Sequence, residues 1–253
     1  MVGVGRVGGA FARGLCSAGW PVVVVTHSAR SRLRARRLKL SIADDRALAQ
    51  AELCLFTVPD DLLAGTIQAF RNRLSPRAAR VHCAGALELE ALGPKGQGHA
   101  RGSVHPLCAI SDPEDSLRGY SAAITADSRL LTQQLTRMAE SLGLVPMKVP
   151  SGQRSAYHAG AVLCAGGAVA LLASGIDAMT RAGLSERQAL RALLPMMRSA
   201  LDRVEARGLR DGLTGPWVRG DVGVVKAHLK ALSPPLARLY RLLSERGMSL
   251  LRP

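Results

Sequence analysis

The sequence predicts an α/β protein: a domain built on a parallel sheet, residues 1–150, followed by an all-helical domain, residues 151–253. Two observations predict this. Up to Pro150, short runs rich in β-branched residues alternate with amphipathic stretches, as in sheets whose strands are joined by helices. After Pro150 only helical patterns follow. The chain of 253 residues is 47% hydrophobic, which is enough for a core made mainly of Leu, Val and Ala.

The elements are expected in a definite order. The expected strands cover residues 1–4, 21–26, 53–58, 80–83, a run ending near 105, 122–125 and 144–149. The expected helices cover residues 11–18, 29–40, a helix beginning at 60, 128–142, 155–182, 185–207, 221–232 and 235–246. We expect Asp60, Ser185 and Asp221 to cap helices, because short polar side chains accept hydrogen bonds from the free N–H groups at helix starts.

The chain is strongly basic: 34 Lys and Arg against 19 Asp and Glu give a formal net charge of +15. Such a charge is typical of proteins that bind nucleic acid or anionic membranes. We favour the alternative that arginine is spread over helix surfaces, because aromatic residues make up 3% of the chain and no DNA-reading motif is present. No nucleic-acid partner is therefore expected. The densest basic group is Arg30, Arg32, Arg34, Arg36 and Arg37.

The cysteines indicate a reducing compartment. The five are scattered, odd in number and form no C-x-x-C pair, so neither a disulfide framework nor a metal site is expected. No signal-peptide pattern opens the chain, and we expect a cytoplasmic protein. Residues 159–176 carry no charge and reach the length of a membrane-spanning candidate, but small residues dominate them. We therefore expect a buried central helix and no membrane association.

Gly3, Gly5 and Gly8 form the pattern G-x-G-x-x-G between a short apolar run and a helical stretch. In this Rossmann-type arrangement the first glycine permits a tight turn, the second lets the backbone approach a pyrophosphate, and the third lets the helix pack on the strand. The helix N-terminus also offers free N–H groups to a phosphate. We predict a dinucleotide site, against the alternative of a glycine-rich turn without a ligand. The first strand is almost absent, so we expect either a native start several residues earlier or a truncated chain.

The end of the second strand predicts which dinucleotide binds. NAD-binding folds place an acid there for the ribose 2′-hydroxyl, but here the strand ends in T-H-S-A-R-S-R. Ser28, Arg30 and Arg32 suit a 2′-phosphate, since arginine binds phosphate bidentately, so the predicted cofactor is NADP(H). His27 is expected at the adenosine end, and the remaining three arginines of the group on a solvated helix face. The residues predicted to contact the cofactor are Gly3, Gly5, Arg6, Val7, Gly8, Ser28, Arg30, Arg32, Val58, Pro59, Ala84 and Gly85.

Motifs spread over nearly the whole chain carry a resemblance. They are GVGRVGGAFARGL (residues 3–15), TVPDD (57–61), VHCAGA (81–86), GSVHPL (102–107), YHAGAV (157–162) and LTGPWVRGD (213–221), the last followed by His228 and Leu232. Together they resemble the Rossmann-like proteins with a DUF2520 C-terminal domain, distant relatives of pyrroline-5-carboxylate reductase, ketopantoate reductase, prephenate dehydrogenase and the 6-phosphogluconate dehydrogenase superfamily. The resemblance implies a two-domain reductase whose helical domain often forms a dimer. Some members resemble an alternative ketopantoate reductase.

Two positions depart from the pattern that the resemblance implies. Members of the family usually carry Ser where this chain has Ala84, and Asn where it has Gly166. Both polar groups would face the nicotinamide and the substrate. Their loss puts catalysis or the usual substrate in question, while dinucleotide binding is expected to remain.

Two histidines are the candidates for proton transfer, because imidazole titrates near neutrality. His105 ends a strand at its carboxyl end, where open α/β sheets bind ligands, and the related prephenate dehydrogenases place a His-Pro pair similarly. His158 lies in the first turns of the long helix, where relatives carry a catalytic Lys. For each histidine the alternative is a structural hydrogen bond. The adjacent Tyr157 is predicted to bind substrate, although its side chain is expected to point to a different side from that of His158.

The loop before the last two helices provides further candidates. Arg219 is predicted to bind a substrate carboxylate and Thr214 to hydrogen-bond the substrate. The alternative is that Arg219, Asp221 and His228 form a structural network that fixes the loop. Three other residues are assigned no function: a structural His82, a surface-loop His99 and a small buried Cys108.

These observations favour an NADP(H)-dependent oxidoreductase that reduces a small keto acid or imine, with ketopantoate as one candidate. The alternative is a catalytically degenerate dinucleotide-binding protein with a regulatory or structural role. A binder of anionic polymers is the third hypothesis. The expected partners are a small-molecule substrate and a second copy of the chain, paired through the helical domain.

Overall fold

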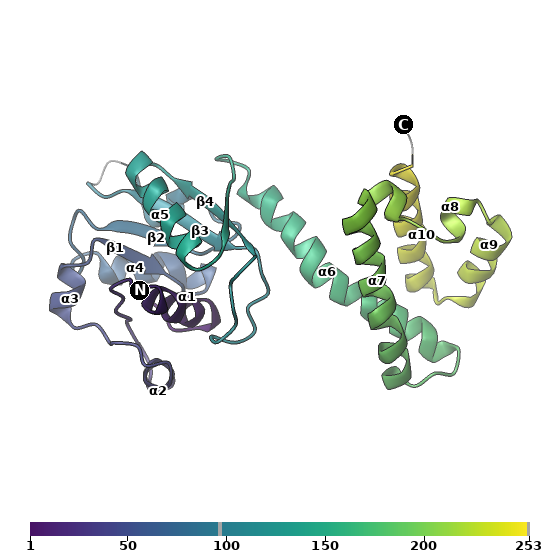
Figure 1. Cartoon of the computed structure of the whole chain (residues 1–253), viewed down its shortest axis with the longest axis horizontal. Coiled ribbons are helices and arrows are strands. Elements are labelled where there is room, and N and C mark those ends of the chain that lie inside the picture. The colour runs from purple at the N-terminus through teal and green to yellow at the C-terminus, as the bar shows by residue number, and fades with distance from the viewer. Residues whose placement is uncertain (96–97, 252–253) are drawn as a thin grey trace. The chain divides into compact units, whose positions relative to one another are not determined.

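The computed structural model describes residues 1–95 and 98–251 (Figure 1). The chain forms two compact units, Met1–Val162 and Leu163–Pro253, and each is described by itself below. The first unit contains a sheet with helices and the second contains helices only, so the predicted fold class is confirmed. The predicted domain boundary near residue 150 stays a prediction.

The sheet consists of five strands in the order β1-β2-β3-β4-β5. Their bounds are β1 Leu53–Phe56, β2 Ala79–His82, β3 Arg101–Pro106, β4 Ser121–Ala126 and β5 Val145–Lys148. Pairing is parallel between β1 and β2, β2 and β3, and β4 and β5, but β3 and β4 are antiparallel. A mainly parallel sheet is therefore confirmed. Because β1, β2 and β3 run in one direction, the residues that follow them meet at one edge of the sheet.

The expected strands at residues 1–4 and 21–26 are not regular strands, and this expectation is wrong. Isolated parallel bridges join Val2 to Val25 and to Phe56, and Val24 to Ile42. Gly3 follows with a φ of +101°, which takes the backbone out of the extended region directly after the bridged residue. The glycine turn thus begins before a ladder can form, although the bridges continue the sheet beyond β1.

The helices of the first unit differ from the predicted ones mainly at their starts. They are α1 Arg6–Ser17, α2 Ala29–Arg37, α3 Asp45–Ala49, α4 Leu63–Phe70 and α5 Arg129–Ser141, with short 3₁₀ turns η1 Asp60–Leu62 and η2 Leu89–Leu92. Helix α1 begins directly after Gly5, earlier than predicted. The predicted cap at Asp60 is wrong, because Pro59 occupies the cap position of η1 and makes no side-chain cap bond within the described chain. Helix α3, whose first turn is capped by the carboxylate of Asp44, was not predicted from the sequence.

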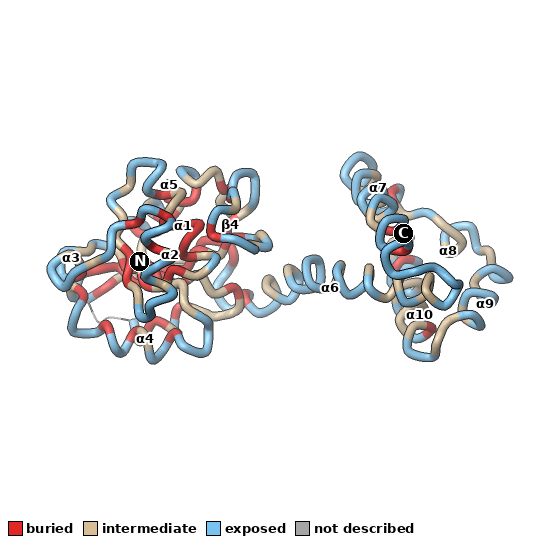
Figure 2. Tube along the Cα trace, turned by 90° about the horizontal axis from the view of Figure 1, so that it is seen from below, coloured by how far each residue is buried: buried red, intermediate tan, exposed pale blue. Residues whose placement is uncertain are grey.

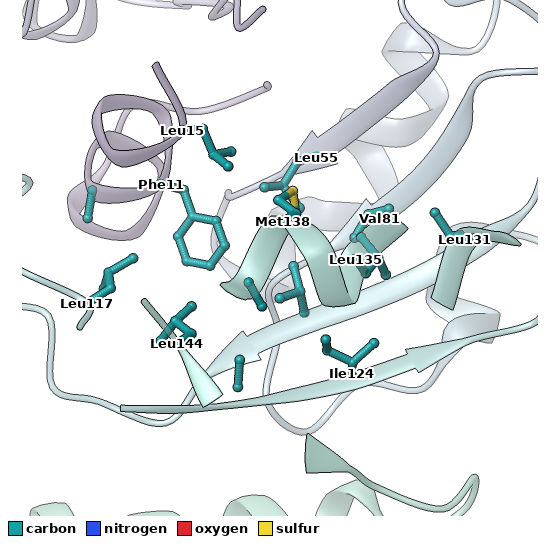
Figure 3. Close-up of a cluster of buried hydrophobic side chains, with 14 of the residues drawn as sticks. Phe11, Leu15, Leu55, Val81, Leu117, Ile124, Leu131, Leu135, Met138 and Leu144 are labelled. Atoms are coloured by element: carbon teal, nitrogen blue, oxygen red, sulfur yellow. The ribbon is translucent and has the colours of Figure 1, made fainter. Parts of the chain in front are cut away.

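The sheet carries a hydrophobic core on each face, as strand periodicity requires. Leu55 and Val81 project to the face covered by α1 and α5, where Phe11, Leu135 and their neighbours fill the space (Figure 3). Phe56, one residue along β1, projects to the opposite face, where α4 packs. A third cluster lies between α1 and α2 and includes Val4, Ala12 and Leu38. Helices therefore cover both faces of the sheet.

The second unit is built from helices of unequal length. The helices are α6 Arg154–Arg181, which begins in the first unit, α7 Glu186–Gly212, α8 Pro216–Arg219, α9 Val222–Ala231 and α10 Pro234–Ser249. The predicted cap at Ser185 is confirmed, since its hydroxyl and the side chain of Gln188 form a reciprocal capping box. Gly208 interrupts α7 with a φ of +78°. The short α8 occupies what the sequence analysis predicted as loop.

Helix α6 is not the buried helix that the sequence analysis predicted. None of its most apolar 18-residue window is buried among the described residues, and Figure 2 shows the helix mainly in the colours of exposed and intermediate residues. The side chain of Leu163 is 74% exposed and that of Val169 is 69% exposed. Packing within each unit therefore does not account for the apolar character of this segment. By length and composition alone, α6 could also cross a membrane.

Candidate functional site

The glycine loop is shaped by close backbone contacts. A Cβ at Gly8 would lie 2.3 Å from the carbonyl oxygen of Gly3 and from Oγ1 of Thr57, so a side chain cannot fit there. The Thr57 hydroxyl donates to the Gly3 carbonyl at 2.9 Å, a contact that the sequence analysis missed. A Cβ at Gly5, in contrast, would meet no described atom within 4 Å. Two glycines thus permit packing, while the third leaves the N-terminus of α1 open to an incoming group.

A pocket of about 550 Å³ lies at this open end. It is lined by Gly5, Arg6, Ser28, Arg30, Ser31, Arg34, Arg37, Ser111, Asp112 and Pro113. The glycine loop and the start of α2 therefore face one space, as the sequence analysis predicted for Gly5, Arg6, Ser28 and Arg30. Four arginines line the pocket, which makes it suited to anions.

Helix geometry decides which arginines of α2 reach the pocket. Arg30, Arg34 and Arg37 are spaced i, i+4 and i+7, so they lie on one face of the helix. Arg34 is half-buried and donates from Nη1 to the carbonyl of Val4 at 2.7 Å. The predicted solvated face is therefore wrong for Arg34, whereas Arg37 lines the pocket with an exposed side chain. Arg32 lies on another face of α2 and does not line the pocket in the part of the chain that the structure describes.

The segment 111–113 forms another wall of the pocket, and no sequence signal identified it. The guanidinium of Arg37 lies 3.6 Å from Glu114 and 4.0 Å from Asp112. Arg13 on α1 donates to the carbonyl of Glu114 at 2.7 Å. Asp112 therefore adds one carboxylate to a pocket lined by four guanidinium groups, and the net charge of the lining residues stays positive.

The remaining predicted cofactor contacts lie outside this pocket. Val58 and Pro59 follow β1, and Ala84 and Gly85 follow β2, at the same edge of the sheet. Val7 packs against the core cluster under α1. His27 packs edge-on against Phe70 of α4, with ring centroids 5.8 Å apart. The predicted contacts of these residues with a cofactor stay predictions.

Three aromatic side chains meet at the carboxyl end of β3. Nδ1 of His105 and the hydroxyl of Tyr157 are 2.8 Å apart. The ring of His158 lies edge-on to His105, with centroids 5.5 Å apart. The structure thus brings the two predicted catalytic histidines together. The expectation that Tyr157 points away from His158 is wrong, because neighbouring positions in the first turns of α6 both reach His105.

Gly85 lies directly against the two histidines. A Cβ at this position would lie 2.3 Å from Nδ1 of His158 and 2.9 Å from Nε2 of His105. Nδ1 of His158 is buried and has no hydrogen-bond partner among the residues that the structure describes. The absence of a side chain at Gly85 is therefore what allows both imidazoles to approach the turn after β2.

The turn after β2 is held on both sides by buried polar groups. The N–H of Ala84 donates to Nδ1 of His82 at 3.2 Å, so this nitrogen is unprotonated and its ring proton is on Nε2. Nη2 of Arg154 donates to the carbonyl of Ala84 at 2.6 Å, and Nη1 donates to Oγ1 of Thr125 at 3.3 Å. Arg154 is fully buried, and its backbone N–H donates to the carboxylate of Glu88 at 3.2 Å. Arg154 was not predicted as a site residue, because nothing in the sequence distinguishes it from the many other arginines of the chain.

The surroundings keep both buried histidines uncharged near neutral pH. Burial, followed by the charges of His158 and Arg154, lowers the pKa of His105 from 6.5 to about 4. Burial and Arg154 likewise lower the pKa of His82 to about 4. Burial raises the pKa of the Tyr157 hydroxyl, so it stays protonated. The site therefore holds neutral groups that can each donate or accept a hydrogen bond.

Comparison with known families matches the two parts of the chain separately. Residues 1–107 match the Rossmann-like domain, and residues 120–247 match the family described as a domain of unknown function, DUF2520. The chain belongs to the DUF2520 family. The resemblance predicted from the motifs is confirmed. No protein of curated function matches this DUF2520 protein.

Solved structures share the fold of this DUF2520 protein at low sequence identity. A provisionally assigned NADP oxidoreductase from Bacteroides fragilis is 24% identical, with a TM-score of 0.78 over 97% of this chain and 95% of that chain. A protein from Thermotoga maritima is 23% identical, with a TM-score of 0.78 over 99% and 96%. The 1-pyrroline-5-carboxylate reductase of Streptococcus pyogenes is 16% identical, with a TM-score of 0.70 over 98% and 96%. These matches show a shared fold.

The second unit of the DUF2520 protein holds the remaining predicted residues. Arg219 donates to the carboxylate of Asp221 at 2.8 Å, and this pair is exposed. The predicted cap at Asp221 is wrong: within the described helix start its carboxylate makes no cap bond, because Arg219 occupies it. Nδ1 of His228 lies 2.8 Å from the hydroxyl of Tyr240, so the described hydrogen bond of His228 is with Tyr240 and not with the Arg219–Asp221 pair. The predicted substrate contacts of Arg219 and of the exposed Thr214 stay predictions.

Three residues without a predicted function are also placed. His82 is buried in β2 and bonds to the adjacent turn, a structural role as expected. His99, predicted on the surface, is buried, because the next residue already pairs with β2 and draws the chain into the core. Cys108 is half-buried, and all five cysteines are free thiols.

Proposed function

We propose that this chain is an NADP(H)-dependent oxidoreductase that reduces a C=O or C=N bond in a small keto acid or imine, a ketopantoate-like acid being one candidate. One observation carries the proposal: the glycine loop opens onto an arginine-lined pocket, and the same edge of the sheet carries the half-buried pair His105 and His158. A Rossmann-type sheet binds its dinucleotide and its substrate along that edge.

The pocket fits the phosphates of a dinucleotide. Gly5 leaves room for a pyrophosphate against the N-terminus of α1, whose N–H groups and dipole favour an anion. Arg30 and Arg34 on one face of α2 suit a 2′-phosphate, and the bond from Arg34 to Val4 holds one guanidinium in place. Ser28 uses its hydroxyl in a capping box with Ser31 but still lines the pocket. These contacts favour NADP(H) over NAD(H).

The histidine cluster supplies the proton that such a reduction needs. The nicotinamide, when bound, supplies the hydride. His158 and His105 hold imidazole nitrogens beside Gly85, within reach of one small group at the edge of the sheet. Tyr157 fixes the orientation of the His105 ring through the hydroxyl contact at 2.8 Å. His105, whose ring is neutral near pH 7, can stabilise a developing oxyanion by donating a hydrogen bond, and we assign His158 as the proton donor.

A specific observation favours the alternative of a dinucleotide-binding protein without turnover. Ala84 takes part in the turn after β2 only through its backbone, because its N–H and carbonyl are bonded to His82 and Arg154. No polar side chain is available at this position, where the resemblance implies a serine. In that case NADPH would bind and no carbonyl compound would be reduced.

The test follows NADPH consumption by the purified chain over a panel of keto acids and cyclic imines, beginning with ketopantoate. The proposal predicts turnover with one substrate class and a loss of activity in His158→Ala. Binding of NADPH without turnover on the whole panel supports the degenerate alternative.

Arg34 offers a matched test of the cofactor assignment. Removing a charge-assisted bond to the 2′-phosphate costs about 1.5–3 kcal/mol, so Arg34→Ala is expected to weaken NADPH binding about 10- to 100-fold and to leave NADH binding unchanged. Arg36→Ala is the control, because Arg36 is exposed and does not line the pocket in the described chain. Equal weakening in both variants would contradict the assignment.

The exposed apolar surface of α6 supports the proposal of a cytoplasmic homodimer. Val162, Leu163 and Val169 would leave water if a second copy covered the helix, and each methylene buried contributes about 0.8 kcal/mol. Sedimentation of the purified chain without detergent tests this proposal. A dimer supports it, whereas recovery only in a membrane or detergent fraction would contradict it.

A further inference from the structure

We propose that Arg154 is the positioning residue of this site: it holds the Ala84–Gly85 turn against the two histidines, where the ring proton of His105 is on Nε2 and Tyr157 donates to Nδ1. The inference rests on the proposed function for the identity of the reaction, but not for the proton positions.

The first support is the burial of Arg154. Its side chain has no exposed surface, and a buried guanidinium is costly unless several groups accept its protons. Here the carbonyl of Ala84 accepts at 2.6 Å and the hydroxyl of Thr125 at 3.3 Å, while Glu88 lies beside the backbone N–H. Burying this guanidinium costs free energy, and its shortest hydrogen bond is to the turn that touches the histidines.

The second support is the position of Gly85, one residue after the carbonyl that Arg154 holds. The contact between Gly85 and the imidazoles leaves no room for a Cβ, so a small displacement of this turn changes the space around both rings. His82 holds the N–H of Ala84 from the other side. The turn is therefore fixed by two buried side chains from β2 and α6, and Arg154 is the only one of the two that carries a charge near neutral pH.

The third support is helix geometry on α6. Arg154, Tyr157 and His158 are spaced i, i+3 and i+4, so they share one face of the helix. The positive charge of Arg154 acts on both His105 and Tyr157: it lowers the pKa of the imidazole and opposes the rise that burial causes in the pKa of the phenol. A phenol beside a cation is a stronger hydrogen-bond donor, and a neutral imidazole is the acceptor it needs.

The proton positions follow from this arrangement. If the Tyr157 hydroxyl donates to Nδ1, the single proton of the neutral His105 ring is on Nε2, the nitrogen beside Gly85. The described titratable groups around the pair come from three places: Arg154, Tyr157 and His158 on α6, His82 and Cys83 at the end of β2, and Glu88 before η2. Of these only Glu88 carries a negative charge near neutral pH, and it lies against Arg154.

The test is a pH titration of the ¹⁵N-histidine-labelled full chain by NMR, which reports charge and tautomer of each ring without cofactor or substrate. His105→Gln identifies the His105 signals by their loss. In the wild type we expect a neutral ring with its proton on Nε2 at pH 6. In Arg154→Met the midpoint should rise part of the way from about 4 towards 6.5, and in Arg154→Lys, which keeps the charge, it should stay low.

Two outcomes would overturn the inference. One is a wild-type His105 ring that is charged at pH 6 or protonated on Nδ1; the wild-type spectrum alone would show this. The other is a folded Arg154→Met chain whose His105 midpoint does not move. If the single variant does not fold, Arg154→Met combined with Glu88→Gln removes both charges, and the His105 midpoint is measured in that double variant instead. Failure of NADPH to bind would contradict the proposed function and leave these readouts unchanged.

Discussion

In the part of the chain that the structure describes, two His–Tyr pairs have the same hydrogen bond in different surroundings. His105 and Tyr157 in the first unit, and His228 and Tyr240 in the second, each join Nδ1 to a phenol oxygen at 2.8 Å with the rings edge-on. The second pair is exposed and packs against Trp217. The first pair is mostly enclosed and adjoins a second imidazole.

The difference teaches that the hydrogen bond alone does not make a reactive site. Around His105 the protein adds burial, the ring of His158 and a buried cation, and these lower its pKa to about 4. His228 lies in the last turn of the exposed α9, where its bond to Tyr240 ties two helices together. The first pair therefore belongs to the proposed chemistry, and the second serves as its internal control.

The largest expected effect comes from removing each imidazole in turn. His105→Gln should lower turnover of a responsive substrate about 10²- to 10³-fold, the range for losing one hydrogen-bond donor to a developing oxyanion. His228→Gln should leave turnover nearly unchanged. Initial rates of NADPH oxidation measure both. Equal losses in the two variants would remove the distinction between the pairs.

The next effect concerns how the free energy of unfolding changes with pH. The folded-state pKa of His105 lies below its unfolded value of 6.5, so its contribution to the free energy of unfolding is present above pH 6.5 and is lost as the pH falls towards 4. The loss for this residue is at most about 3 kcal/mol. Urea unfolding between pH 7 and pH 4 should show a shallower decline in His105→Gln than in the wild type. A slope in His105→Gln equal to that of the wild type would contradict the burial argument.

Gly85 gives a smaller effect through packing. A Cβ there would lie 2.3 Å from His158, so Gly85→Ala should displace the ring and cost about 2 kcal/mol of unfolding free energy. Gly160→Ala is the matched control, because a Cβ on that helical glycine meets no described atom within 4 Å. It should stabilise the chain by about 0.5–1 kcal/mol. In thermal unfolding, the Tm should fall in Gly85→Ala and rise in Gly160→Ala.

The smallest effect separates the two tyrosines. Tyr157→Phe leaves a buried imidazole nitrogen without its partner and should cost about 1–2 kcal/mol, whereas Tyr240→Phe frees an exposed one and should cost about 0.5 kcal/mol. Denaturant unfolding measures the difference. A larger cost at Tyr240 would mean that its pair is the more enclosed one in solution.

The sequence predicted those parts of the molecule that local rules determine. The glycine loop, the apolar runs of β1 to β5 and the cap at Ser185 follow from backbone and periodicity requirements, and the structure has them. His105 and His158 were also candidates from the sequence, each for its own position, but that their rings meet is a finding of the structure.

The parts that could not be predicted depend on contacts between distant residues. The choice of Arg34 over Arg32 depends on which face of α2 is turned towards Val4. Arg154 forms its bonds with residues 29 and 70 positions away. The exposure of α6 could not be predicted, because its composition suits a buried helix and an interface helix equally well.

The most direct test of the central claim is a titration of the purified chain with NADPH and with NADH, followed by nicotinamide fluorescence. The arginine-lined pocket predicts that NADPH binds at least about tenfold more tightly, a difference of about 1.4 kcal/mol. Equal affinity for the two would contradict the assignment of the 2′-phosphate to α2. Binding of neither would contradict the dinucleotide site itself, and with it the proposed reductase.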